Sequence, residues 1–205
     1  YKSLICKDFL FTSFRYSICF ITAMKKYIYL IIFMTNSIIT AQNLDLINTS
    51  KDIGIEDWRI VNDDVMGGVS SSTLYLNEEQ NLVFSGNLSL ENNGGFASSR
   101  MGFERGILDK VKFFKLKVKG DGKTYKFRFR EGYRSTNYSS NFDTIKNEWI
   151  EIEIKTSNLK PMFMGYYSSR SPKLDTKKLS SLGFQISDKQ KGDFKLEIMH
   201  VKAIY

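Results

Sequence analysis

The clearest structural signal in this chain lies in residues 113–130, which read F-F-K-L-K-V-K-G-D-G-K-T-Y-K-F-R-F-R. On both sides of the central G-D-G, apolar or aromatic residues alternate with lysine or arginine. Strict alternation of this kind is typical of antiparallel strands that bury one face and expose the other. We therefore predict two strands here, joined by a tight hairpin turn in which Gly120 and Gly122 permit the required backbone angles.

The same period-two pattern recurs in other segments of the chain. Isoleucine alternates with charged residues at 150–155. Shorter strand candidates are residues 58–61, 72–76, 81–90, 96–101, 182–186 and 194–205. About nine strands without a convincing long amphipathic helix predict an all-β protein built as a β-sandwich. Trp58 and Trp149 fall within strand-like segments, so we expect both in the core.

Two further stretches each place acid or amide side chains beside a double glycine. They read W-R-I-V-N-D-D-V-M-G-G-V-S-S-S (58–72) and F-S-G-N-L-S-L-E-N-N-G-G-F-A-S-S-R (84–100). Glycine pairs permit positive φ angles or close approach of neighbouring atoms, and adjacent Asn and Asp favour turns. The residues predicted to form structural turns are Gly67, Gly68, Gly94 and Gly95, with Gly120 and Gly122 in the basic segment.

These two stretches, followed in order by residues 119–130, 147–154 and 188–198, resemble the complex I intermediate-associated protein 30 family. The resemblance spans residues 46–205. It implies a jelly-roll β-sandwich of the galactose-binding-domain-like type, and the mitochondrial members of the family assist the assembly of respiratory complex I. The chain departs from the family at P-M-F-M-G (161–165), because the family usually has Arg-Gly after Pro-x-Phe.

Residues 24–41 have the form of a secretory signal peptide. Two lysines follow Met24, a largely apolar run follows them, and small residues precede the expected cleavage point after Ala41. We expect export, to the periplasm or out of the cell, and the alternative is an uncleaved leader that anchors the protein in a membrane. Residues 1–23 are interpreted as an upstream segment of doubtful origin, and residues 42–205 as a single β-sandwich domain.

Charge and cysteine content exclude several classes of protein. The formal net charge is +8, but the first 41 residues hold five of the 30 basic and one of the 22 acidic residues, which leaves +4 for the domain. That value is ordinary for a globular domain, so we expect no nucleic-acid partner. Both cysteines, Cys6 and Cys19, precede the domain, which excludes disulfides, thiol catalysis and cysteine metal sites from it.

The sequence offers few groups for catalysis. Its one histidine, His200, lies within a strand pattern and is interpreted as a structural residue. No G-x-S-x-G elbow, H-E-x-x-H helix or phosphate-binding glycine loop occurs. We therefore expect a protein that is not an enzyme and that uses no cofactor or metal. An Asp/Glu-based or calcium-dependent hydrolase is the weaker alternative.

Polar and aromatic side chains gather in the predicted loops, which is where jelly rolls of the galactose-binding type generally engage ligands. Loops 131–142 and 165–170 are rich in Tyr, Ser and Asn, a composition that recurs in binding surfaces. The predicted binding rim consists of Asp63, Asp64, Asn92, Asn93, Arg100, Tyr133 and Tyr138. The acids and amides have two further interpretations: they bond backbone amides and shape the turns, or they supply oxygen ligands to calcium.

Six cations alternate with the apolar residues of 113–130 and would share one face of the predicted hairpin. They are Lys115, Lys117, Lys119, Lys126, Arg128 and Arg130. That face is either a docking surface for an acidic partner or a solvated face whose cations pair with Glu151 and Glu153. Arg128 and Arg130 are the preferred candidates for ligand or partner contact, because arginine suits bidentate recognition.

These observations predict a non-catalytic binding module. The family resemblance implies an assembly-factor or chaperone-like protein that binds a protein client. An exported carbohydrate-binding module is the alternative, supported by the sandwich fold, the leader and the tyrosine-rich loops. The expected partner is therefore a protein client or a glycan, with membrane contact only through an uncleaved leader, and the sequence leaves the oligomeric state open.

Overall fold

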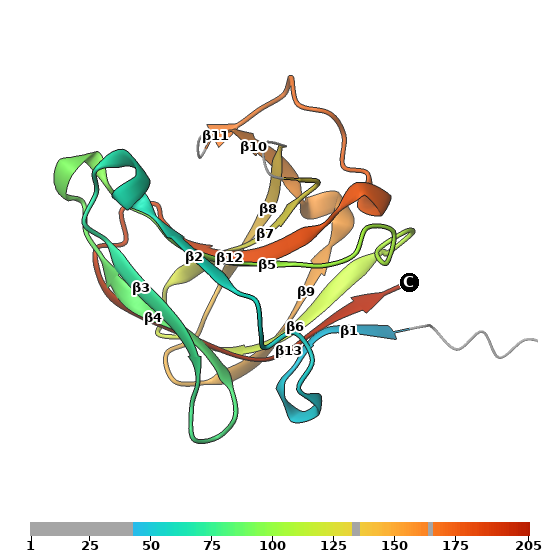
Figure 1. Ribbon diagram of the computed structural model, residues 1–205, viewed down its shortest axis with the longest axis horizontal. Coiled ribbons are helices and arrows are strands. Elements are labelled where there is room, and N and C mark those ends of the chain that lie inside the picture. The colour runs from blue at the N-terminus through green and yellow to red at the C-terminus, as the bar shows by residue number, and fades with distance from the viewer. Residues whose placement is uncertain (1–42, 133–135, 164–165) are drawn as a thin grey trace, which may run out of the picture. The chain divides into compact units, whose positions relative to one another are not determined.

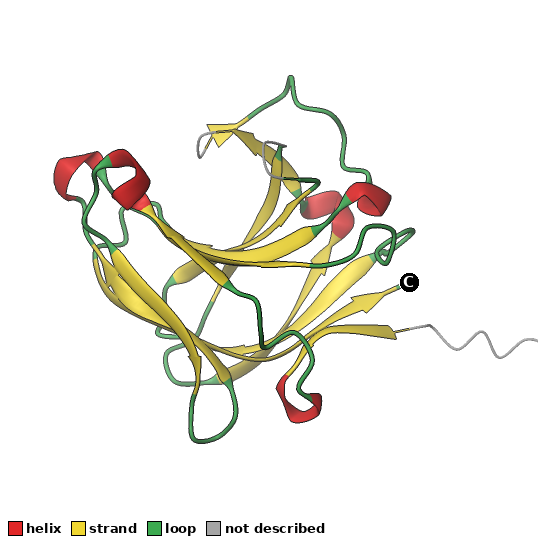
Figure 2. Ribbon diagram, viewed as in Figure 1, coloured by secondary structure: helices red, strands yellow, loops and turns green. Residues whose placement is uncertain are grey.

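The computed structural model describes residues 43–132, 136–163 and 166–205, and these form two antiparallel sheets (Figures 1 and 2). The predicted leader and residues 1–23 lie outside the described residues. The strands are β1 (Asn43–Asn48), β2 (Arg59–Asn62), β3 (Ser71–Leu76), β4 (Leu82–Leu88), β5 (Ala97–Gly102), β6 (Phe113–Lys119), β7 (Thr124–Arg130), β8 (Asn137–Asp143), β9 (Trp149–Lys155), β10 (Lys160–Phe163), β11 (Tyr166–Tyr167), β12 (Ser181–Ile186) and β13 (Gly192–Ile204). The short 3-10 turns are η1 (Thr49–Lys51), η2 (Asp63–Met66), η3 (Glu91–Asn93), η4 (Thr156–Asn158) and η5 (Thr176–Lys178).

One sheet has six strands and is organised around β13. Its order is β3-β4-β13-β6-β9, and β1 also pairs with β13. The first half of β13 pairs with β4 and the second half with β1, while β6 lies along its other side. The last strand in sequence is therefore the central strand of this sheet.

The other sheet has seven strands in the order β11-β10-β8-β7-β12-β5-β2. Figure 1 shows that this sheet curves, with β10 and β11 turned away from the six-stranded sheet at one end. Its inner face packs on the six-stranded sheet, and its outer face is concave.

The predicted hairpin at residues 113–130 is wrong, although both of its strands exist. β6 belongs to the six-stranded sheet and β7 to the seven-stranded sheet, so the Gly-Asp-Gly loop carries the chain across the sandwich. The apolar faces of the two strands meet across the interior, where the Phe114 ring lies 5.5 Å from the Phe127 ring and 4.6 Å from the Phe129 ring. Face-to-face packing buries these aromatic rings more completely than side-by-side pairing in one sheet would.

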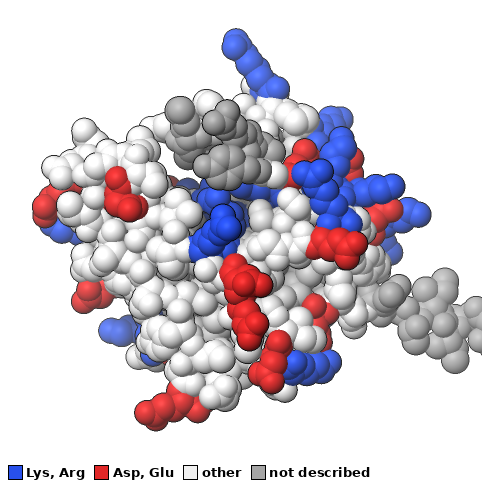
Figure 3. Space-filling model, viewed as in Figure 1, with Lys and Arg blue, Asp and Glu red and all other residues white. Residues whose placement is uncertain are grey.

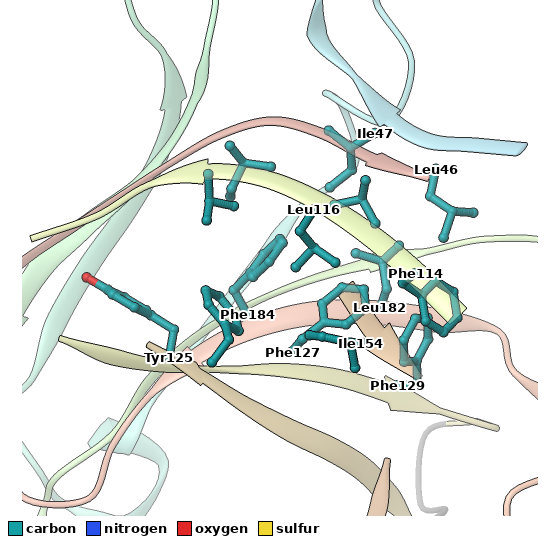
Figure 4. Packing of buried hydrophobic residues seen from close by; sticks show 14 of the residues in the cluster. Leu46, Ile47, Phe114, Leu116, Tyr125, Phe127, Phe129, Ile154, Leu182 and Phe184 are labelled. Carbon is teal, nitrogen blue, oxygen red and sulfur yellow. The ribbon is translucent and has the colours of Figure 1, made fainter. Parts of the chain in front are cut away.

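The core between the sheets is rich in phenylalanine. Phe127 contacts Phe129, with ring centroids 4.8 Å apart, and Phe184, at 5.6 Å. Figure 4 shows these rings together with Leu116 and Ile154 in the space between the two layers. The alternating apolar residues noted in the sequence supply this layer, as the period-two pattern predicts.

The structure contains strands that the sequence pattern did not predict. β8 occupies a segment that was interpreted as a Tyr-, Ser- and Asn-rich loop, and it buries Tyr138 and Phe142 in the core. Burial of these two rings and pairing with β7 outweigh the low strand preference of serine and asparagine. β1 and the short strands β10 and β11 were also missed.

The protein is thus all-β, a jelly-roll sandwich of the galactose-binding-domain-like type, as predicted. Within the described residues no helix is long and apolar enough to cross a membrane.

Candidate functional site

The two glycine-rich stretches meet in space around the carboxylate of Asp63. Ser70 donates to this carboxylate twice, from its backbone N–H at 2.9 Å and from its hydroxyl at 2.5 Å. From the second stretch, the backbone N–H groups of Gly95 and Phe96 donate to Oδ2 at 2.6 Å and 3.3 Å. One buried side chain therefore holds two turns that are far apart in the sequence.

The four glycines of these turns each have a structural reason to be glycine. A Cβ atom on Gly68 would lie 2.4 Å from the Asp63 carboxylate, and one on Gly94 would lie 2.6 Å from it. Gly67 and Gly95 have φ angles of +88° and +134°, which residues with a side chain rarely adopt. The glycines thus leave room for the carboxylate and let both chains turn around it.

Asp63 is a structural residue and does not belong to an exposed binding rim. It is 1 % exposed, so its predicted place in such a rim is wrong. Burial alone would raise the pKa of Asp63, but the hydrogen bonds from Ser70, Gly95 and Phe96 outweigh burial and hold the pKa below its usual value. The second interpretation of the sequence, in which the acid shapes the turn, describes this residue.

The other polar residues of the predicted rim separate into two places. Asp64, Asn92 and Asn93 are exposed on the turns η2 and η3, which Asp63 holds together. Arg100 lies in the strand β5 and projects onto the concave outer face of the seven-stranded sheet. The rim and the sheet face are therefore two different surfaces.

A groove of about 660 Å³ lies on this concave face. Its lining combines arginine, serine and glycine with one tryptophan and one aspartate. The lining residues are Asp57, Trp58, Arg59, Val61, Arg100, Gly102, Arg130, Gly132, Ser180 and Ser181. Figure 3, which has the same viewpoint as Figure 1, shows basic side chains near the middle of the view, at the level of β2, β5 and β12.

The strand register places the arginines in a row across the sheet. Arg59 on β2 is opposite Arg100 on β5, and Arg100 is opposite Gly183 on β12. Gly183 is in turn opposite Arg128 on β7. A Cβ on Gly183 would lie 2.2 Å from the Ser99 carbonyl oxygen, so no side chain separates Arg100 from Arg128 at this register position.

Burial and mutual repulsion perturb the arginines of the row. Burial, followed by the charges of Arg130 and Arg100, lowers the pKa of Arg128 to about 9. Burial also lowers the pKa of Arg100. Within the described part of the chain, no ion pair joins Arg59, Arg100 or Arg128 to an acid, whereas Arg130 donates from Nε to the side-chain carbonyl of Asn137. This row can therefore accept a negatively charged group from outside.

The family model for complex I intermediate-associated protein 30 (CIA30) matches residues 47–198 of the chain. The chain belongs to this family. The matched part of this CIA30 member contains Asp63 and its two glycine turns. It also contains every arginine of the row. Among the curated proteins, no sequence matches the chain.

Solved carbohydrate-binding modules share the fold of this CIA30 member. The family 11 module of the cellulosomal cellulase Lic26A-Cel5E of Clostridium thermocellum has a TM-score of 0.61 and 15 % identity, over 80 % of this chain and 95 % of the module. A family 11 module from that organism in complex with a β-1,3-1,4-mixed-linked tetrasaccharide has a TM-score of 0.61 and 16 % identity, over 80 % and 96 %. A mutant of the family 29 module CBM29-2 has a TM-score of 0.51 and 9 % identity, over 81 % and 87 %.

Trp58 has a double role in this CIA30 member. Its ring stacks on Phe184, with centroids 6.2 Å apart, and its indole N–H donates to the Gly54 carbonyl at 3.0 Å. It also lines the groove, so it is both a partly buried core residue and part of the candidate site. Trp149, in contrast, lies outside the core on the outer face of the six-stranded sheet, where the Lys119 ammonium is 5.1 Å from its ring centre.

The tyrosines of the predicted rim are not a loop surface. Tyr138 is fully buried in β8, and its hydroxyl donates to the Pro172 carbonyl at 3.1 Å. Burial, assisted by the charge of Glu131, raises the pKa of Tyr138 to about 12. The expectation that Tyr138 contacts a ligand is therefore corrected, and Tyr133 lies outside the described residues.

The six cations of residues 113–130 do not share one face, because their two strands belong to different sheets. Lys115, Lys117 and Lys119 lie on the outer face of the six-stranded sheet, and the register sets Glu153 opposite Lys115 and Glu151 opposite Lys117. Lys126, Arg128 and Arg130 lie on the outer face of the other sheet. Of these six cations, Arg130 is the one among the described lining residues of the groove.

The structure offers little support for metal or histidine chemistry. His200 is half-buried in β13, and burial, together with the charge of Lys202, lowers its pKa. In residues 43–132, 136–163 and 166–205, no group of three His, Cys, Asp or Glu side chains is arranged to hold a metal ion.

Sequence reasoning missed Arg59 and the row to which it belongs. Arg59 sits in a predicted strand, and period-two alternation places it on the same face as Val61. What the sequence does not contain is the order of the strands, which brings β2, β5, β12 and β7 together. The departure from the family pattern at 161–165 falls partly on residues 164–165, outside the described residues.

Proposed function

We propose that this protein is a non-catalytic carbohydrate-binding module that binds its ligand in the groove on the concave face of the seven-stranded sheet. The observation that carries the proposal is the groove itself, which brings arginines, serines and Trp58 together in one lining. Guanidinium and hydroxyl groups hydrogen-bond sugar hydroxyls, and an indole ring offers an apolar face for packing against a sugar.

The size of the groove supports a small or chain-like ligand over a folded partner. Its volume of about 660 Å³ lies within the range of about 300–1,000 Å³ that is typical of ligand pockets. A stable interface between two folded proteins instead buries roughly 1,200–2,000 Å² of surface, which is commonly broad and relatively flat. A groove that is open along a sheet face suits one segment of a polymer.

The similar folds add independent support. The family 11 module from Clostridium thermocellum was solved in complex with a mixed-linked tetrasaccharide. The proposed leader at residues 24–41 would deliver the protein to the cell exterior or periplasm, where polysaccharides are accessible. Asp57 is the one carboxylate among the described lining residues, whereas glycoside hydrolysis generally uses two.

A bulky neutral side chain in the groove tests this function, because it fills the groove and leaves the charge of the groove unchanged. Ser181→Trp places a bulky ring on the outer face of β12, opposite Gly102 and Arg130. The matched control is Ser85→Trp, on the outer face of the six-stranded sheet and opposite Lys195. Binding to a panel of soluble neutral and acidic oligosaccharides, measured by calorimetry, should be lost in Ser181→Trp and kept in Ser85→Trp.

If no oligosaccharide of the panel binds the parent protein, the function lies elsewhere. If a bound oligosaccharide is retained by Ser181→Trp at parental affinity, the groove is not its site. Melting temperatures of both variants should stay near that of the parent, since both serines are on outer faces.

A second candidate function is the binding of a protein client, as an assembly factor. The family match favours it, and so do three exposed apolar side chains on and beside the turn η2: Val65, Met66 and Val69 are 68 %, 75 % and 53 % exposed. Apolar side chains exposed in one short segment commonly mark contact with another macromolecule. A photo-crosslinking residue at Met66 should then capture a specific protein in cells, and the same residue at Glu78 should not.

A further inference from the structure

The described lining of the groove holds more basic than acidic side chains. Arg59, Arg100 and Arg130 line it, and Asp57 is the one acid among the described lining residues. Resting on the carbohydrate-binding function proposed above, we propose that the ligand is an anionic glycan, whose carboxylate or sulfate groups bind along the row formed by Arg59, Arg100 and Arg128.

Several lysines of this protein form ion pairs with acids, which the arginines of the row do not do in the described part of the chain. Lys126, on the same strand and face as Arg128, pairs with Asp188 at 2.8 Å. Glu197 pairs with Lys119 at 3.0 Å and with Lys195 at 2.9 Å on the opposite sheet. These three lysines are thus paired with acids, whereas within the described residues no ion pair joins the arginines of the row to an acid.

Close packing of the arginines costs electrostatic free energy. Arg128 is partly buried, and the charges of Arg130 and Arg100 act on it. Desolvation and like-charge repulsion both disfavour its protonated form and lower its pKa. An anion placed between these side chains would reverse the repulsion, so the site is arranged to gain most from a negatively charged ligand.

Arginine and the width of the row specify the kind of anion. A guanidinium donates two parallel hydrogen bonds to a carboxylate or a sulfate, which a lysine ammonium does not. The row from β2 through β5 and β12 to β7 spans three strand spacings, or about 14 Å at ~4.8 Å per spacing. That width exceeds a single small anion and fits several acidic groups repeated along one polymer.

Paired probes that differ only in charge test this inference. An oligogalacturonate and its carboxyl-reduced form make one pair, and a sulfated oligosaccharide and its desulfated form make the other. Each is titrated calorimetrically into the purified full-length protein at fixed salt. In at least one pair we expect the charged member to bind at least about tenfold more tightly, because a charge-assisted hydrogen bond contributes more than the ~1.4 kcal/mol that a factor of ten represents.

The outcomes separate this inference from the proposed function. Equal binding of charged and neutral members in both pairs overturns the inference and leaves the carbohydrate-binding function in place. Failure of all four probes to bind overturns the inference, and the wider oligosaccharide panel then decides the proposed function. Binding of poly-glutamate as tightly as the better charged glycan overturns the assignment to glycans and favours an acidic protein segment.

Substitutions localise the effect to the row. Arg100→Gln with Arg128→Gln should weaken the charged glycan by at least about tenfold. Lys115→Gln with Lys117→Gln removes the same charge from the opposite sheet and should leave affinity unchanged. Equal weakening by both double variants would indicate a general charge effect and overturn the inference.

Two further variants keep the test valid if the first double variant does not fold. Arg59 is exposed at the edge strand β2, so Arg59→Gln should preserve the fold and still weaken the charged glycan several-fold. Arg128→Lys keeps the charge and loses the forked hydrogen bonds, so it should bind less tightly than the parent. Parental affinity in both of these variants overturns the inference.

Discussion

The Asp63 carboxylate accepts a hydrogen bond of 2.6 Å from the backbone N–H of Gly95, which lies 32 positions further along the chain. This bond joins the turn after β2 to the turn before β5. Because Ser70 and Phe96 donate to the same carboxylate, a single side chain fixes the geometry of one end of the sandwich.

Loss of the Asp63 carboxylate should therefore destabilise the protein strongly. Asp63→Ala leaves several buried donors without an acceptor, at a cost of roughly 1–3 kcal/mol for each fully buried group. We expect the free energy of unfolding, measured by urea denaturation, to fall by about 3 kcal/mol or more. The neighbouring Asp64→Ala is the control, because Asp64 is exposed and should change stability by less than about 0.5 kcal/mol. Equal effects of the two substitutions would show that the carboxylate does not hold the turns.

The same carboxylate should make stability depend on pH. The pKa of Asp63 is lowered in the folded protein, so its contribution is complete above the unfolded value of about 3.9 and is lost as the pH falls through the folded value. The parent should thus lose more stability between pH 7 and pH 3 than Asp63→Asn, which does not titrate at this position. Parallel stability curves for the two proteins would contradict the assignment.

Gly94→Ala should destabilise the parent by about 1 kcal/mol or more, because its Cβ would lie 2.6 Å from the Asp63 carboxylate. The cost should shrink in an Asp63→Ala background, where that contact is absent, and a double-mutant cycle measures the difference. Gly102→Ala is a control with room for a Cβ, since its nearest neighbour is the Ser180 carbonyl at 3.9 Å. Simple additivity of the Gly94 and Asp63 substitutions would exclude a direct steric link.

Tyr138 should behave as a core residue. Tyr138→Ala should cost about 3–5 kcal/mol, comparable to the loss of a buried phenylalanine. Tyr138→Phe keeps the ring and loses the hydroxyl's hydrogen bonds to the Pro172 carbonyl and the Glu131 carboxylate, so it should cost about 0.5–1.5 kcal/mol. Tyr167→Ala, at a position that is 64 % exposed, should leave the melting temperature nearly unchanged. A melting temperature for Tyr138→Ala close to that of the parent would restore this residue as a candidate for ligand contact.

The alternating residues of 113–130 predicted both strands correctly but not their arrangement. Alternation reports which face of a strand is buried, and both Phe114 and Phe127 were rightly placed inside. It does not report which strand is the neighbour, because a hairpin and a crossover between sheets bury the same residues. In the observed fold Gly120 is needed for space, because its Cβ would lie 2.3 Å from the Thr144 hydroxyl oxygen.

The sequence predicted only part of the candidate site, again because it does not give the order of the strands. Arg100 and Arg128 were each singled out, one for a rim and the other for a hairpin face. Their common row depends on β12, whose Gly183 lies between them in the register. Pairings between distant strands are a property of the folded chain, and no local pattern in the sequence encodes this one.

The central position of β13 has a consequence for the synthesis of this protein. The six-stranded sheet cannot close around β4, β6 and β1 until Gly192–Ile204 has left the ribosome, because that strand supplies the partner of all three. The strands β1, β4 and β6 are synthesised before β13, so until then the edges that pair with β13 lack their partner. The six-stranded sheet of a nascent chain therefore stays incomplete until the residues of β13 have emerged, however early its other strands are made.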